Sequence, residues 1–436
     1  MAARADWRMA LEPADIAEIE SATDALIASD TDIATITAGA FPLPHLGPRL
    51  KARAQDEVLN GRGFLLIRGL PVERWSLRQS ATAYFGLGAH LGPARSQNGQ
   101  GHVLGHVQDL GLDAGDPSVR IYQTNARQTF HTDSCDVVAL LCLKTAQSGG
   151  LSALVSATTI FNEMRRRRPD LLKLLFEPIA TDRRGEVPEG CKPFFTIPVF
   201  TWHQGYLSAI YQRQYIDSAQ RFPDAPRLTP AHVEALDLFD ALADDPALNM
   251  TMEFRPGDVQ LVHNHTLLHD RTEFIDWPEP ERRRHLLRLW LAADGARPLP
   301  DVFAERYGST RVGDRGGVIV RSTKLQAPLV VADRLITFGE AWAALSEGVH
   351  WQLSTEQDGA LRSYHDRKYR LIHSWDKHGE EKVIDIVDDK TVFSAHLSEP
   401  IETKFYRRSD NASDPAVQKS LRQLLAYARL RTKQNA

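Results

Sequence analysis

The stretch RPGDVQLVHNHTLLHDR, residues 255–271, opens with a Pro-Gly turn signal, continues as the apolar run VQLV and ends in a histidine-rich segment. A second run, RHLLRLWLA at residues 284–292, combines apolar residues with two arginines. Short apolar runs bounded by Gly or Pro are typical of buried strands. These two runs therefore predict β-strands of a β-rich core.

Similar strand-like runs fill residues 103–157, whereas helical periodicity marks residues 13–29, 48–59, 76–91, 158–176 and 229–244. A β-rich core flanked by helices predicts a closed or sandwiched antiparallel architecture. We expect a helical N-terminal segment over residues 1–62, a core domain over 63–298 and a C-terminal α+β extension of unknown role over 299–436. In the extension we expect a helix at 335–345, strands in KYRLIHSW, KVIDIVDD and KTVFSAHL, and a final amphipathic helix at 414–431.

The composition, with 42% hydrophobic and 25% charged residues, is that of an ordinary globular protein, and a net charge of −4 disfavours a nucleic-acid partner. No stretch is apolar for long enough to cross a membrane, and the N-terminus lacks the pattern of a signal peptide. Three cysteines without metal-site spacing predict reduced thiols. We therefore expect a cytoplasmic protein with a small-molecule partner, and the sequence leaves room for a homo-oligomer.

The sequence FHTDS places His131 and Asp133 two residues apart, so in a strand both side chains point to the same face and can bind one metal ion. Two histidines and one carboxylate on one face of an octahedron leave three positions open, the arrangement of non-haem iron oxygenases. About one His-x-Asp tripeptide is expected by chance in a chain with 16 histidines, so the pair is weak evidence alone. The third ligand could be any of His263, His265 and His269.

A wider pattern resembles the taurine-dioxygenase-like (TauD/TfdA) family of iron(II)/2-oxoglutarate oxygenases over roughly residues 63–292. The pattern comprises His131-x-Asp133, Gly149-Gly150-x-Ser152, Gly257-Asp258-Val259, Asn264, His269 and Arg284 to Arg288. This resemblance implies a double-stranded β-helix (jelly roll). It also implies Fe(II) as cofactor, 2-oxoglutarate and O2 as co-substrates, and hydroxylation of a small organic substrate with release of succinate and CO2.

The resemblance also assigns roles to individual residues. His131, Asp133 and His269 would be the iron ligands and catalytic residues. Arg284 would bind the distal carboxylate of 2-oxoglutarate through paired hydrogen bonds, with Ser152 beside it. The gap of 269 to 284, 15 residues, is longer than in the short form of the family, so Arg283 stays an alternative.

Four further residues are expected at the substrate. Asn125 and Arg127 share strand parity with His131, unless a bend at Ala126 breaks it, and Tyr122 lies in a family region around the substrate. Arg288 would lie near the substrate, and a second buried guanidinium without a partner is unfavourable, which favours an anionic substrate.

An internal carboxylate, such as Asp133 or Asp270, could pair with Arg288 instead. The sequence also leaves open a desaturating or C-heteroatom-cleaving oxygenase, and a non-catalytic jelly-roll binding protein. It does not identify the substrate.

Overall fold

The computed structural model describes residues 7–111, 114, 120–320 and 323–329, together with the backbone of seven strands between residues 333 and 408. The chain divides into two compact units, one reaching Leu329 and the other containing residues from Val330 onward. The first unit therefore includes both the expected N-terminal segment 1–62 and residues 299–329. In the structure the division falls 31 residues after the expected one at 298 (329 − 298), because side chains such as Phe303 and Val318 pack in apolar clusters of the first unit.

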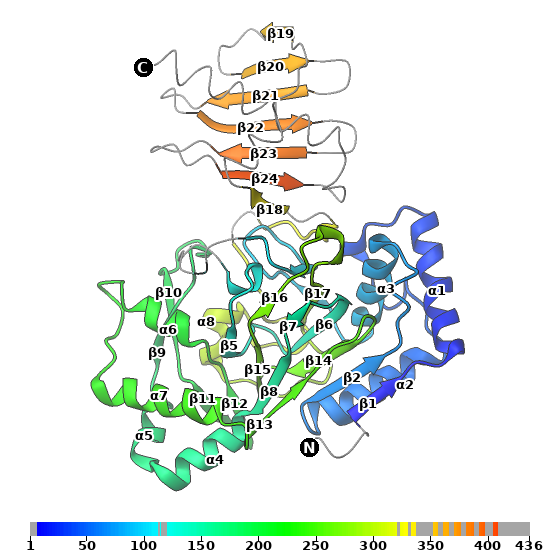
Figure 1. Ribbon diagram of the computed structural model, residues 1–436. Helices are drawn as coiled ribbons and strands as arrows, with labels where there is room; N and C mark the ends of the chain where they lie inside the picture. Colours follow the sequence, from blue (N-terminus) through cyan, green and yellow to red (C-terminus); the bar gives the residue numbers. More distant parts are fainter. Residues whose placement is uncertain are drawn as a thin grey trace. The chain divides into compact units, whose positions relative to one another are not determined.

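The first unit contains two main sheets, as the jelly-roll expectation requires (Figure 1). The larger sheet has the order β1-β2-β14-β6-β17-β3, with β4 also paired to β17. Its strands are β1 (Arg8–Ala10), β2 (Phe64–Arg68), β3 (Ala94–Arg95), β4 (Gly105–Val107), β6 (Val137–Lys144), β14 (Val259–His263) and β17 (His285–Leu291).

The smaller sheet has the order β13-β8-β15-β5, all antiparallel. Its strands are β5 (Gln128–His131), β8 (Ser152–Ser156), β13 (Asn249–Met252) and β15 (Leu267–Arg271). Three two-stranded ribbons complete the β structure of this unit: β9 (Ile179–Asp182) with β10 (Phe194–Ile197), β11 (Phe200–His203) with β12 (Tyr206–Ala209), and β7 (Ser148–Gly149) with β16 (Phe274–Ile275).

Side chains alternate between two apolar clusters along the strands, as the two-residue period of a strand dictates. On β17, Leu287 and Leu289 belong to the cluster beneath the N-terminal helices, whereas Leu286 and Trp290 belong to the cluster between the sheets. Burial of both faces explains why β17 reads as a nearly continuous apolar run. Arg288, between Leu287 and Leu289, shares the inner face.

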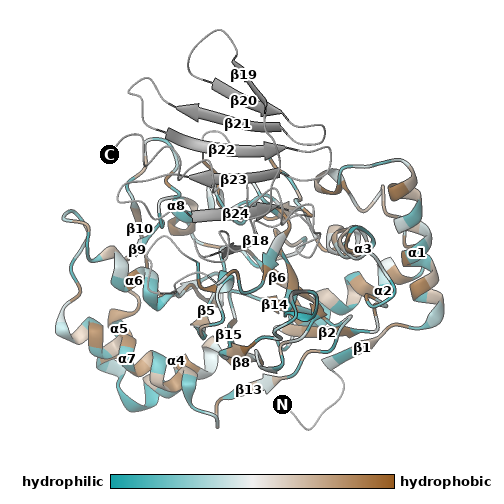
Figure 2. Ribbon diagram, turned by 45° about the horizontal axis from the view of Figure 1, so that its top comes forward, coloured by the Kyte–Doolittle hydropathy of each residue, from teal (hydrophilic) through white to brown (hydrophobic). Residues whose placement is uncertain are grey.

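Helices cover the outer faces of both sheets. The helices α1 (Pro13–Ala28), α2 (Leu46–Arg53) and α3 (Leu77–Ala89) lie beside the larger sheet, and α4 (Ala157–Arg167), α5 (Pro169–Leu174) and α7 (Pro230–Asp244) lie beside the smaller one (Figure 1). Their surfaces mix hydrophilic and hydrophobic residues (Figure 2), and their buried residues form the two outer cores. Two short helices, α6 (Arg213–Ala219) and α8 (Ala304–Tyr307), lie nearer the site.

The Gly-Asp-Val motif is structural. Asp258 is fully buried and accepts two hydrogen bonds from the guanidinium of Arg68 at 2.7 Å each, which joins the start of β14 to the end of β2. Gly257 has φ +85°, and a Cβ there would lie 2.0 Å from the carbonyl oxygen of Leu70. Only glycine fits this turn without displacing the backbone.

The second unit contains a seven-stranded antiparallel sheet of order β18-β24-β23-β22-β21-β20-β19. Its strands are β18 (Asp333–Ile336), β19 (Gln352–Thr355), β20 (Leu361–His365), β21 (Arg370–Trp375), β22 (Glu381–Val387), β23 (Val392–His396) and β24 (Lys404–Arg408). The three expected strands are present, but the helix expected from residue 335 is wrong at its start, because β18 pairs with β24 there. The expected helix at 414–431 lies outside the described residues.

Candidate active site

The two predicted histidine ligands lie directly opposite each other on neighbouring strands of the smaller sheet. His131 ends β5 and His269 is central in β15, and the two residues are register partners with ring centroids 4.2 Å apart. The fold therefore brings together residues that are 138 positions apart in the sequence (269 − 131).

Asp133 lies beyond the end of β5, so strand parity is not what positions it. Its backbone N–H donates to Oδ1 of Asn264 (3.0 Å), and the N–H of Thr132 donates to the carbonyl oxygen of Tyr211 (2.8 Å). These two bonds hold the loop so that the Asp133 carboxylate faces both imidazoles. The motif residue Asn264 thus positions the ligand loop.

Ligand atoms of His131, Asp133 and His269 all lie within 4.8 Å of one another, a spacing that one metal ion can bridge. Oδ1 of Asp133 is 3.9 Å from Nε2 of His131, and Oδ2 is 3.7 Å from Nε2 of His269. Nδ1 of His131 lies 2.8 Å from the carbonyl oxygen of Thr129, which fixes the proton on Nδ1 and leaves the Nε2 lone pair for a metal.

The protonation states also suit a metal. Burial lowers the pKa of His269 to about 3, and the pKa of His131 is lowered for the same reason. Burial by itself would raise the pKa of Asp133, but Arg288 and the two histidines lower it overall. At neutral pH the site therefore offers two neutral imidazoles and a carboxylate.

One carboxylate oxygen of Asp133, Oδ2, also contacts two side chains other than the histidines. Oδ2 accepts a hydrogen bond from the indole Nε1 of Trp290 (2.8 Å) and lies 3.4 Å from Nη1 of Arg288. Nε of Arg288 donates to Oε1 of Gln97 (2.7 Å), and the guanidinium lies 4.7 Å from the ring centroid of Tyr122. Arg288 is therefore paired with Asp133, so the sequence argument for an anionic substrate, which required Arg288 to lack a partner, is wrong.

Arg284 lies with His131, His269 and Ser152 in one cavity of about 520 Å³. Its Nη1 is buried and has no hydrogen-bond partner among the described residues, and burial lowers its pKa to about 10. A buried cation with an unsatisfied donor requires an anion. Gly150, with φ +67°, makes room for it, because a Cβ there would lie 2.9 Å from Nε of Arg284.

The alternatives for these roles have other partners. Arg283 donates to the carbonyl oxygens of Trp277 and Pro278 and lines neither cavity. His265 is fully buried, with Nε2 3.0 Å from Oδ1 of Asp136, and His263 contacts the hydroxyl of Thr266. The geometry thus favours Arg284 over Arg283, and His269 over the two other histidines.

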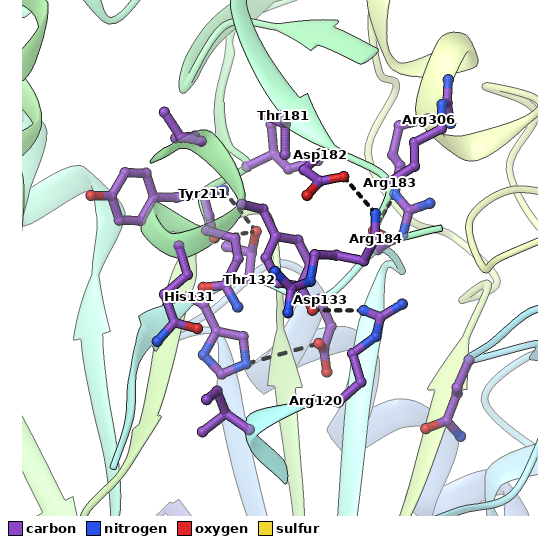
Figure 3. Close-up of a pocket in the computed structure, with 18 of the residues that line it drawn as sticks. Arg120, His131, Thr132, Asp133, Thr181, Asp182, Arg183, Arg184, Tyr211 and Arg306 are labelled. Atoms are coloured by element: carbon purple, nitrogen blue, oxygen red, sulfur yellow. Dashed lines mark hydrogen bonds and ion pairs between the residues drawn. The ribbon is translucent and has the colours of Figure 1, made fainter. Parts of the chain in front are cut away.

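A second, larger cavity of about 910 Å³ is lined by His131 and Asp133 (Figure 3). Tyr122 and Arg288 line both cavities, which agrees with their expected place near the substrate. Arg120, Arg183, Arg184 and Arg306 also line the larger cavity, and the sequence analysis missed all four. No local motif marks them, because three segments far apart in the sequence bring them together: the residue before the 3-10 helix Ile121–Gln123, the turn after β9, and α8.

Asn125 and Arg127 line neither cavity, so their expected position at the substrate is wrong. Strand β5 begins only at Gln128, and the parity from His131 does not extend to these residues. Asn125 is exposed, and Arg127 forms ion pairs with Asp244 (2.6 Å) and Asp270 (2.7 Å).

Two imidazoles and one carboxylate beside a cavity that contains an unpaired arginine define the site of a non-haem iron oxygenase with an anionic co-substrate. Comparison with known proteins agrees. The family model "Taurine catabolism dioxygenase TauD, TfdA family" matches residues 29–290. The chain belongs to this family, and it is an Fe(II)/2-oxoglutarate-dependent dioxygenase.

Among characterised relatives, FR-33289 synthase of Streptomyces rubellomurinus is 32% identical over 312 residues, which cover 69% of this chain and 90% of the relative. Taurine hydroxylase-like protein SAT17 of Stachybotrys chartarum is 31% identical over 294 residues, covering 65% and 74%. Uridine-5'-phosphate dioxygenase of a Streptomyces species is 27% identical over 263 residues, covering 56% and 90%.

Solved structures share the fold. An asparagine oxygenase in complex with Fe(II), 3-hydroxyasparagine and succinate has a TM-score of 0.50 and 18% identity, covering 65% of this chain and 93% of its own. The non-haem iron oxygenase OrfP with Fe, succinate and a dihydroxyarginine has a TM-score of 0.50 and 14% identity, covering 73% and 99%. Among the described residues no helix is long and apolar enough to cross a membrane.

Proposed function

We propose that the protein hydroxylates a small organic substrate in the larger cavity and releases succinate and CO2. The observation that carries the proposal is that the metal site adjoins two cavities: His131 lines both, His269 lines the one that contains Arg284, and Asp133 lines the larger one, which is open for a substrate. His131, Asp133 and His269 would hold the iron, which would supply the redox centre for O2 activation coupled to decarboxylation of 2-oxoglutarate.

The residues around the three metal ligands have different roles in this proposal. Arg284 would hold the distal carboxylate of 2-oxoglutarate, and the Ser152 hydroxyl, which Gln260 Nε2 approaches to 3.1 Å, lines the same cavity. Trp290 and Arg288 would keep the Asp133 carboxylate oriented by holding Oδ2. Apolar side chains of the cavity, such as Leu286, would exclude water from the reaction.

We further propose that the protein works in a reducing compartment, the cytoplasm, where ferrous iron persists. Cys135 and Cys142 are buried free thiols and Cys191 is an exposed one, which supports this proposal. That the partner is a small molecule and not a nucleic acid stays a prediction, as does a homo-oligomeric state.

The test is an anaerobic titration of the full chain with Fe(II) and 2-oxoglutarate, followed by visible absorption. We expect a charge-transfer band that Arg284→Ala weakens and Arg283→Ala preserves. A screen of small acids, amino acids and phosphate esters for O2-dependent succinate release would then find the substrate, and the product would separate hydroxylation from desaturation or cleavage. Absence of the band in the wild-type chain would contradict the proposal.

A further inference from the structure

Gln128 lies where the two cavities of the site meet. It lines both of them, and among the described residues Tyr122, His131 and Arg288 are the others that do so. His131 is a metal ligand, and the guanidinium of Arg288 contacts the ring of Tyr122 and the carboxylate of Asp133. Gln128 is the remaining side chain at this junction, and binding of the metal does not require it.

A β-bulge directs Gln128 towards the metal site. His131 on β5 is the register partner of His269 on β15. The next pair is Gln128 with Arg271, so two residues of β5 face a single residue of β15 between the pairs. In a regular strand, residues three apart point to opposite faces, and the extra residue returns Gln128 to the face of His131. Bulges next to active sites often redirect one side chain in this way.

The carboxamide of Gln128 has one atom beside a metal ligand and one atom without a partner. Its Nε2 lies 3.5 Å from Nε2 of His131, which is an acceptor because the His131 proton is on Nδ1, bonded to the carbonyl oxygen of Thr129. The opposite amide orientation would place two acceptors against each other. Oε1 of Gln128 is therefore the free end, and this buried oxygen has no hydrogen-bond partner in the described part of the chain.

The co-substrates cannot supply the missing donor. A buried acceptor without a hydrogen bond is unfavourable. At neutral pH 2-oxoglutarate has carboxylate and keto oxygens, and O2 has no hydrogen, so both offer acceptors only. Gln212, at the N-terminus of α6, is a second acceptor of this kind in the larger cavity, because its Oε1 is also buried without a partner. The donor that remains for these oxygens is a group of the prime substrate.

The charges around the larger cavity favour an uncharged donor. The acidic residues among its described lining are Asp133 and Asp182 (Figure 3). Asp133 faces the metal site and Arg288, whereas Asp182 forms an ion pair with Arg221 and accepts from the hydroxyl of Ser218 (2.6 Å). Both carboxylates are thus engaged, and Arg288 at the junction would repel an ammonium group. A hydroxyl or an amide N–H fits the site better.

We propose that Gln128 determines substrate specificity by accepting, at Oε1, a hydrogen bond from an uncharged O–H or N–H group of the prime substrate. The inference rests on the proposed function, because it assumes a substrate that lies in the larger cavity next to the metal. A site built to hydrogen-bond one substrate group rejects analogues that lack the group, since its buried acceptor is then left unpaired. The substrate class is a small molecule that carries a hydroxyl or an amide N–H close to the oxidised carbon.

The first measurement needs no ligand. Gln128→Met keeps the length of the side chain and removes the unpaired acceptor, so the Tm of the free protein should stay the same or increase. Gln147→Met, at an exposed glutamine, is the matched control and should leave the Tm unchanged. A decrease in Tm beyond that of the control would mean that Gln128 has a structural role in the free protein, and it would overturn the inference.

The second measurement is calorimetric binding of paired probes to the full chain with Fe(II) and 2-oxoglutarate, without oxygen. The two members of each pair differ in one donor: 3-hydroxybutanoate and butanoate, 3-hydroxypropylphosphonate and propylphosphonate, and N-acetylglycine and N-acetylsarcosine. We expect the wild-type chain to bind the donor-bearing member of at least one pair at least tenfold more tightly. Gln128→Met should abolish this preference, and Gln128→Glu, which keeps an acceptor, should retain part of it.

Two results of the second measurement would overturn the inference: equal affinity within every pair, including no binding of any probe, or a preference that persists in Gln128→Met. The visible band of the Fe(II)/2-oxoglutarate complex, recorded on the same samples, should persist in Gln128→Met. Absence of the band in the wild-type chain would contradict the proposed function. A wild-type band without any donor preference would contradict only the role of Gln128.

Discussion

Replacement of Arg315 by methionine should destabilise the oxygenase unit strongly. Arg315 and Asp136 are both fully buried, with Nε and Nη2 of Arg315 at 2.9 Å and 2.7 Å from Oδ1 of Asp136. The same guanidinium donates to the carbonyl oxygens of Thr310 (3.1 Å) and Arg297 (2.7 Å). Methionine fills a similar volume but leaves the carboxylate and two carbonyl groups without these donors.

Removing one partner of a buried pair costs about 3–5 kcal/mol in the free energy of unfolding, because the remaining charge stays buried. For a unit of this size, about 2–4 °C of Tm per kcal/mol gives a decrease of roughly 6–20 °C. The Asp136 carboxylate also accepts hydrogen bonds from His265 and from the N–H of Ala293, and it keeps both in the variant. We therefore expect a decrease in Tm in the lower half of this range.

The assay is thermal unfolding followed by circular dichroism, with Arg311→Met as the matched control. Arg311 lies in the same segment, but its ion pair with Asp314 is exposed and solvent screens it, so its loss should change the free energy of unfolding little. Adding Asp136→Asn to Arg315→Met should recover stability relative to Arg315→Met alone, because the buried charge is removed. A decrease in Tm no larger than that of the control would refute the reasoning.

Three further outcomes are expected. His269→Ala should abolish stoichiometric Fe(II) binding, because two protein ligands do not hold ferrous iron. His265→Gln should retain the metal, although the folded protein should be less stable. The reverse pattern in metal analysis would contradict the ligand assignment. Arg284→Ala should weaken 2-oxoglutarate binding by roughly tenfold to hundredfold, since charge-assisted hydrogen bonds contribute about 1.5–3 kcal/mol, and Arg283→Ala should leave it unchanged in the same calorimetric titration. Burial lowers the pKa of His106 to about 4, so between about pH 6.5 and 4 the unfolded chain binds a proton that the folded chain excludes. The contribution of His106 to the free energy of unfolding is therefore complete above about pH 6.5, and it decreases by up to roughly 3 kcal/mol as the pH falls to about 4. Urea unfolding at these two pH values should show a smaller decrease in His106→Gln.

The metal site could be predicted from the sequence because its ligands lie in short motifs. His131 and Asp133 are two residues apart, and the family resemblance assigned the third position to His269, five residues after Asn264. The strand explanation for Asp133 was nevertheless incomplete, because β5 ends at His131 and the side chain of Asn264 positions the next residues. A side-chain contact across 131 residues (264 − 133) leaves no periodic signal.

The four arginines of the larger cavity could not be predicted in this way. Arg306 is 173 residues from Asp133 in sequence (306 − 133), and a short helix brings it to the metal loop. The same limitation explains the error at Arg127, since strand parity is valid only within a strand and β5 starts after that residue. Sequence periodicity predicts which face of an element a side chain occupies, but not which distant loop meets it.

The hydrogen bond from Trp290 to Asp133 should make the fluorescence of Trp290 sensitive to metal binding. An indole whose N–H points at a metal ligand changes its emission when the charge on that carboxylate is shared with a cation, and a ferrous ion nearby quenches it. Trp290 is only 5% exposed, so solvent contributes little to its signal. Metal loading could therefore be followed by fluorescence in unlabelled protein, with Trp290→Phe to subtract the other seven tryptophans of the eight in the chain.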